Sequence, residues 1–205
     1  MEPRRIAGYA IVLILVGVLC VQYIRALEPA ASEDRTGACR RLAPTLFNPK
    51  LGKLPASART IDELKLGFSA QDYTGATVPL SAYRGRVVLV NFWQTNCAPC
   101  KVEMPSMESL LKQFRTDDFV IVTLASEASF DPVRAFFPQG TKLTVLLDPP
   151  DADNIVGKIS RSWGTDKWPE SYLVDRKGNV RYYVVNSRDW SSPDALECVR
   201  ALVSE

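Results

Sequence analysis

From residue 66 to the C-terminus, apolar positions alternate between the spacings typical of strands and of helices. Short continuous apolar runs at 87–92, 119–125 and 143–147 predict strands that are buried on both faces. The expected strands are 67–73, 77–80, 87–92, 119–125, 143–147, 171–174 and 180–185. The expected helices begin near residues 97, 131, 155 and 192 and end near 114, 137, 163 and 202. This order predicts an α/β fold with a mixed central β-sheet flanked by helices.

Two of these helices carry start signals. Asp131 followed by Pro132 predicts a helix N-cap and a first helical residue, and Ser192 followed by Pro193 predicts the same arrangement. Between the last two strands, residues 176–179 form the turn sequence Arg-Lys-Gly-Asn. These signals support the predicted element boundaries.

The N-terminus has a different pattern. Residues 6–24 contain no charged side chain, and as a helix they would span about 28 Å, close to the thickness of a bilayer core. Arg4 and Arg5 precede the run and favour a cytoplasmic N-terminus. We therefore expect one transmembrane signal-anchor within 1–27. A cleaved signal peptide and a lipoprotein modified at Cys20 are the alternatives, and all three export the rest of the chain.

Residues 28–65 are expected to tether a domain at 66–205 to this anchor. The segment contains four prolines and shows no sustained periodicity. Between residues 35 and 59 it has six basic side chains and no acidic one. A solvated linker is the favoured interpretation, and contact with an anionic membrane surface or partner is the alternative.

Composition and charge exclude several function classes. The chain has 25 Lys and Arg against 23 Asp and Glu, so no strong positive field favours nucleic acid. Histidine is absent, which excludes a Ser-His-Asp hydrolase, histidine metal ligands and a C-x-x-C-H haem attachment. The five cysteines are the most reactive side chains.

Cys97 and Cys100 form a C-x-x-C motif between a buried strand and a helix. The N-terminus of a helix offers unpaired N–H groups and a partial positive charge, both of which stabilise a thiolate. We therefore expect Cys97 to be the nucleophile and the more buried Cys100 to resolve a mixed disulfide. Half of a zinc site is the rival interpretation, but Cys39 and Cys198 form no second C-x-x-C motif, so no metal or cofactor is expected.

The stretch N-F-W-Q-T-N-C-A-P-C-K-V-E-M-P at 91–105 resembles the active site of membrane-anchored, thioredoxin-like thiol-disulfide oxidoreductases of the TlpA/ResA type. The lead-in L-S-A-Y-R-G-R-V-V-L-V at 80–90 and the run P-E-S-Y-L-V-D at 169–175, followed by Gly178, resemble the same family. Asn96 departs from the aromatic residue usual in that family, and Lys167-Trp168-Pro169 departs from its small Gly-x-Pro turn.

The resemblance implies a thioredoxin-like domain on the periplasmic side of the bacterial inner membrane, in a single-pass protein. It implies disulfide reduction in exported proteins, such as apocytochromes c during cytochrome c maturation, with electrons from a membrane donor of thiol type. A thioredoxin-fold module that binds a client or metal without turnover is the alternative, and a peroxidase of related fold is a third.

The resemblance also implies roles for three further residues. Glu103, three residues after Cys100, matches an acidic residue near the family's cysteine pair and could shuttle a proton; otherwise it is a surface glutamate that pairs with Lys101. Pro169 is expected to be a cis-proline, with Trp168 binding substrate or merely packing over the cysteines.

The remaining cysteines leave alternatives open. Cys39 and Cys198 could pair within the chain, Cys39 could form an intermolecular bridge, or Cys198 could be a buried free thiol. Cys20 is expected to be an apolar filler of the membrane span.

Overall fold

The computed structural model describes residues 13–23, 37–44, 47–48, 52–53, 62 and 66–205. Its strands are β1 (Phe47–Asn48), β2 (Gly52–Lys53), β3 (Ser69–Gln71), β4 (Thr77–Pro79), β5 (Val87–Trp93), β6 (Phe119–Ala125), β7 (Thr144–Leu147), β8 (Glu170–Val174) and β9 (Val180–Val185). Its named helices are the 3-10 helix η1 (Leu80–Tyr83) and the α-helices α2 (Ala98–Leu111), α3 (Asp131–Phe136), α4 (Lys158–Ser162) and α5 (Pro193–Val203). Residues 13–23 and 37–42 are also helical.

Five strands form the central sheet in the order β7-β6-β5-β8-β9. The strands β5, β6 and β7 are parallel, whereas β8 is antiparallel to both β5 and β9. All seven residues of β5 are buried, as their continuous apolar run predicts for the middle strand. The predicted mixed sheet and its strands are confirmed, and β3 pairs with β4 as the expected hairpin.

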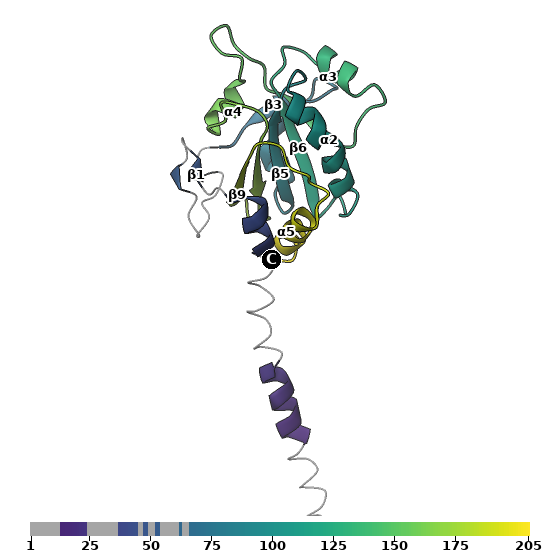
Figure 1. Cartoon of the computed structure of the whole chain (residues 1–205), viewed down its shortest axis with the longest axis vertical. Coiled ribbons are helices and arrows are strands. Elements are labelled where there is room, and N and C mark those ends of the chain that lie inside the picture. The colour runs from purple at the N-terminus through teal and green to yellow at the C-terminus, as the bar shows by residue number, and fades with distance from the viewer. Residues whose placement is uncertain (1–12, 24–36, 45–46, 49–51, 54–61, 63–65) are drawn as a thin grey trace, which may run out of the picture.

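Helices cover both faces of this sheet (Figure 1). On one face, the side chains of Val87, Leu89 and Trp93 belong to a core cluster that includes apolar residues of α2, α3 and α5. On the other face, Val88 and Phe92 belong to a second cluster with residues of η1, the β3–β4 hairpin and the end of α4. Because alternate residues of β5 belong to the two clusters, the strand connects the core beneath α2 with the core on the other face of the sheet.

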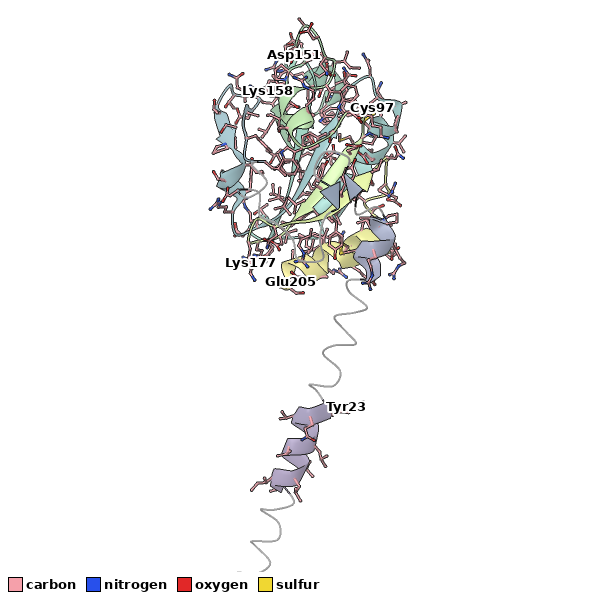
Figure 2. All side chains as sticks on the ribbon, turned by 90° about the vertical axis from the view of Figure 1, so that its left-hand side faces the viewer. Tyr23, Cys97, Asp151, Lys158, Lys177 and Glu205 are labelled. Carbon is pink, nitrogen blue, oxygen red and sulfur yellow. A yellow bond between two sulfur atoms is a disulfide. The ribbon has the colours of Figure 1, made fainter. Side chains whose placement is uncertain are left out.

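The helix at 37–42 lies beside α5, as both views show (Figures 1 and 2). A disulfide joins Cys39 in this helix to Cys198 in α5, and both side chains are buried. Of the alternatives for these cysteines, the structure therefore has the intramolecular pair. Part of the expected tether is thus an ordered helix attached to the domain.

The other expectations for the N-terminus concern residues that are mostly outside the described part. Residues 13–23 are helical, and Cys20 among them is exposed and unpaired. Within the described residues, no helix has the length and apolar character required to cross a membrane. The remainder of the expected anchor at 6–24, and most of the tether at 28–65, lie outside the described residues.

Two helix starts differ from expectation. Asp131 is the first residue of α3 and Phe130 is the N-cap, so the prediction of Asp131 as N-cap is wrong by one position. The helix α4 begins at Lys158 rather than near residue 155, because the buried carboxylate of Asp148 accepts hydrogen bonds from the N–H groups of Ile159 and Ser160. This remote carboxylate fixes the N-terminus of the helix.

Candidate active site

Cys97 and Cys100 form a disulfide at the N-terminus of α2. Cys97 is the N-cap residue, and its Sγ accepts a hydrogen bond from the backbone N–H of Cys100 at 3.2 Å. Cys97 is half-buried, whereas Cys100 is fully buried. Figure 2 shows Cys97 at the end of the domain that also carries Asp151 and Lys158, opposite Lys177 and Glu205. The sulfur of Cys97 is thus the more accessible of the two.

The loop before the cysteines is held by hydrogen bonds to a carboxylate that follows the neighbouring strand β6. Glu127 follows β6, and its Oε1 accepts hydrogen bonds from the backbone N–H of Thr95 at 2.8 Å and from the Thr95 hydroxyl at 2.5 Å. The next residue, Asn96, is exposed beside Cys97. At the position where the resembled family has an aromatic residue, this protein presents a small polar side chain.

Glu103 lies inside the protein, one helical turn beyond Cys100 on α2. Its side chain is 1% exposed, so the alternative of a surface glutamate paired with Lys101 is wrong. Asn91 Nδ2 donates to Oε1 at 2.9 Å, Trp190 Nε1 donates to Oε2 at 3.2 Å, and Arg188 N donates to Oε2 at 3.3 Å. Each carboxylate oxygen therefore has a donor, as a buried acid requires.

Burial raises the pKa of Glu103 from 4.5 to about 7. Loss of hydration disfavours the carboxylate, and this effect exceeds the opposing influence of its hydrogen-bond donors and of the Arg188 guanidinium. A group with this pKa can both accept and donate a proton near neutral pH.

The peptide bond between Trp168 and Pro169 is cis, as predicted. Pro169 is buried and Trp168 is half-buried, with its ring packed against both core clusters. The indole N–H of Trp168 is buried without a hydrogen-bond partner among the described residues. Trp168 and Cys97 both pack against the core cluster on the α2 face.

A second buried acid follows this proline. Glu170 is 2% exposed, and burial raises its pKa against the opposing hydrogen bond from Tyr183. Glu170 pairs with Phe92 across the sheet, whereas Ser171 pairs with Asn91. Glu170 therefore lies on the opposite face of the sheet from Glu103, and the structure does not bring the two acids together.

Asn91, Arg188 and Trp190 contact the carboxyl of Glu103 but were not predicted as site residues. Asn91 carried one sequence signal, since it is a polar residue within the apolar run of β5. Its Nδ2 also donates to Ser171 Oγ at 2.9 Å, which fixes the amide between β8 and α2. The other two follow β9 and have no local signal. Among the described residues, no group of three or more Cys, Asp or Glu side chains could hold a metal ion.

The comparisons with known proteins agree with this arrangement. A model of the AhpC/TSA family matches residues 62–183. Thiol-disulfide oxidoreductase ResA of Bacillus thuringiensis subsp. konkukian is 31% identical over 114 residues, which cover 55% of this chain and 62% of that protein. ResA of Bacillus anthracis is 30% identical over 122 residues, which cover 59% of this chain and 67% of that protein. The chain thus spans somewhat less than two thirds of the length of the first relative.

Among solved structures, a putative thiol:disulfide interchange protein DsbE from Chlorobium tepidum is similar, with a TM-score of 0.57 and 28% identity. The match covers 66% of this chain and 93% of that one. It confirms the predicted thioredoxin-like fold. Together with the cysteine pair at the start of α2, the family match and the relatives show that the chain belongs to the AhpC/TSA family and is of the TlpA/ResA type.

Proposed function

We propose that the protein is a thiol-disulfide oxidoreductase that reduces disulfides in exported proteins through Cys97 and Cys100. The observation that carries this proposal is the placement of the cysteine pair. Cys97 caps α2 with its sulfur facing a backbone N–H, and the partner sulfur is buried behind it. This environment stabilises a thiolate on the accessible cysteine, which is the requirement for attack on a disulfide.

The exchange has two steps. The Cys97 thiolate of the reduced protein attacks a substrate disulfide, which forms a mixed disulfide and releases one substrate thiolate. The Cys100 thiolate then attacks Cys97 Sγ, which closes the protein disulfide and releases the second substrate thiolate. Two electrons pass to the substrate, and both released thiolates take up protons. A thiol donor must then reduce the Cys97–Cys100 disulfide for another cycle.

Glu103 is proposed as the group that handles the proton of Cys100. Cys100 is fully buried, so its thiol needs a nearby base before it can attack. Glu103 lies three residues further along α2, is also buried, and has a pKa of about 7. The carboxylate can accept the thiol proton during oxidation of the pair and return it during reduction.

Trp168 and Pro169 are proposed to bind the substrate. An extended substrate segment could pair with the backbone of Trp168, in the manner of a strand added to an edge. The half-buried ring would then border the bound segment. The exposed amide of Asn96, next to Cys97 in the chain, would provide a further polar contact.

The cellular setting is also a proposal. We place the domain on the periplasmic side of the bacterial inner membrane, held by the N-terminal segment, with a thiol donor in the membrane and apocytochromes c among its substrates. The buried Cys39–Cys198 disulfide supports an oxidising compartment, because disulfides that serve structure persist there. The similarity to ResA and DsbE proteins supports the exchange chemistry.

The test compares Cys97→Ser with Cys100→Ser in the full-length chain, using insulin reduction by a dithiol. Both variants should lose turnover. Only Cys100→Ser, reduced beforehand and freed of the dithiol, should accumulate a mixed disulfide with insulin, visible by mass spectrometry, because Cys97 still attacks and no thiol releases it. A Cys97→Ser variant that reduced insulin like the wild type would overturn the proposal. The Cys20→Ser variant is the control, since that thiol is unpaired.

A further inference from the structure

The hydrogen bonds around Glu103 depend on a loop at the far end of the chain. Two of the three donors to its carboxyl, Arg188 N and Trp190 Nε1, come from the loop between β9 and α5, and both bind Oε2. Only Asn91 comes from the central sheet. The position of this loop therefore decides whether Oε2 has its donors.

The two residues of this loop are fastened to different elements. Trp190 is fully buried, and its backbone N–H donates to Ser106 Oγ on α2 at 3.0 Å. The Arg188 side chain extends the other way. Its Nε donates to the backbone carbonyl of Leu42 at 3.1 Å, and its Nη1 donates to the carbonyl of Ser187 at 3.0 Å. Among the described residues, Arg188 forms no salt bridge, so these carbonyls hold its guanidinium.

Leu42 belongs to the helix at 37–42, which is attached to α5 by the Cys39–Cys198 disulfide. Leu42 and both cysteines are buried. A continuous chain of contacts thus leads from the disulfide to Leu42, from its carbonyl to the Arg188 side chain, and from the Arg188 backbone to Glu103. The segment before the thioredoxin-like domain takes part in building the active site.

We infer that Arg188 is a positioning residue for the Glu103 carboxyl, and that the disulfide-linked helix at 37–42 holds Arg188 in place. The inference matters for catalysis only if the proposed function holds, because Glu103 is the group proposed there to carry the Cys100 proton. The charged and titratable groups that act on Glu103 are few. Arg188 is the charged group that lowers the pKa of Glu103, and the donors Asn91 and Trp190 are neutral; the thiols of Cys97 and Cys100 on the same helix do not titrate in the oxidised protein.

The experiment follows the Glu103 carboxyl by carbon-13 NMR titration in the oxidised full-length chain, where the active cysteines do not titrate. The signal is identified by its loss in Glu103→Gln. Arg188→Met removes the charge of Arg188 and its hydrogen bond to Leu42. It should raise the pKa of Glu103 by about one unit, which lowers the acid ionisation constant of the carboxyl about tenfold. Arg188→Lys keeps a charge and a donor and should restore most of the wild-type value.

A second variant separates position from charge. Cys39→Ala with Cys198→Ala leaves the Arg188 charge in place and removes only the link to α5. It should also raise the pKa of Glu103, by roughly half a unit, as the donor to Oε2 loosens. Cys20→Ser is the matched control and should leave the titration unchanged. Should the double variant fail to fold by near-ultraviolet circular dichroism, Leu42→Ala takes its place, because it keeps the disulfide and the Arg188 charge and loosens only the packing of the 37–42 helix.

Each outcome has one meaning. A titration that does not move in Arg188→Met overturns the positioning role, and the proposed function stands if wild-type protein still reduces insulin. A shift in Arg188→Met with none in a folded double variant shows that Arg188 keeps its place without the disulfide, which overturns the role of the disulfide-linked helix at 37–42. If the titrations move as expected but wild-type protein does not reduce insulin, the proposed function fails and the support of Glu103 stands as a structural property.

Discussion

Replacing Glu103 with glutamine should change how the stability of the protein depends on pH. The folded protein holds the Glu103 proton up to a pKa of about 7, whereas the unfolded chain releases it near 4.5. Between these values the folded state binds more protons, so wild-type stability falls as pH rises. A difference of about 2.5 units at about 1.4 kcal/mol each gives a loss of about 3 kcal/mol between pH 4 and pH 8. Because glutamine does not ionise, the unfolding free energy of Glu103→Gln does not decrease in this way.

The assay is urea denaturation of both oxidised full-length proteins at pH 4, 5, 6, 7 and 8. In Glu103→Gln, an amide N–H faces the donors that bind the carboxyl of the wild type. This mismatch lowers the free energy of unfolding by about 1–3 kcal/mol at every pH. All other groups titrate alike in the two proteins. The unfolding free energy of Glu103→Gln minus that of the wild type should therefore increase by about 3 kcal/mol from pH 4 to pH 8.

The exposed Glu197 on α5 provides a matched control, because Glu197→Gln removes the same charge from the surface. Its stability difference from the wild type should stay within about 0.5 kcal/mol across the range. A flat difference for Glu103→Gln as well would refute the reasoning. It would mean that the buried carboxyl ionises in the folded protein as it does in the unfolded chain.

Three further outcomes are expected. Cys39→Ala with Cys198→Ala frees a loop closed over 159 residues and should lower the unfolding free energy by up to about 5 kcal/mol in urea without reductant; a loss under about 1 kcal/mol would contradict this. Glu127→Ala should lower the unfolding free energy by about 1–3 kcal/mol and speed amide exchange at Thr95, whereas Glu127→Gln keeps an acceptor oxygen and should change both less; wild-type exchange at Thr95 in Glu127→Ala would exclude Glu127 as the group that holds this loop. The dipeptide between the active cysteines has neither histidine nor charge, so a glutathione titration should give a potential nearer about −270 mV than about −120 mV, and a value above about −160 mV would contradict a reducing role.

Local patterns predicted most of the sheet, and remote contacts explain what they missed. The continuous apolar runs of β5 and β6 identify buried strands because both faces of the sheet are covered. The start of α4 could not be predicted from a local apolar pattern. Ile155 has helical spacing to Ile159 but is 70% exposed, and the helix begins only after Gly157, which lies too close to Asp148 for a side chain.

The candidate site likewise contains residues that local spacing predicts and residues that only remote contacts bring together. The cysteine pair and Glu103 lie within seven consecutive positions, so spacing alone places them on one helix end. The donors to Glu103 are 12, 85 and 87 residues away in the chain, and no periodicity connects them. Only the polar Asn91 inside an apolar strand indicated that a buried hydrogen-bond network lay beside the helix.

The disulfide between Cys39 and Cys198 also sets the reach of the domain. With the N-terminal segment anchored as proposed, 13 residues at 24–36 separate the described helical residues 13–23 from the helix at 37–42. Fully extended, they would span at most about 45 Å, against about 150 Å for a linker that ended at residue 65. A shorter linker confines the catalytic domain to a smaller volume and raises its effective concentration toward membrane partners. With the proposed anchor, the bond would keep the end of the domain formed by the 37–42 helix and α5 within this shorter reach of the bilayer, with Cys97 at the opposite end (Figures 1 and 2).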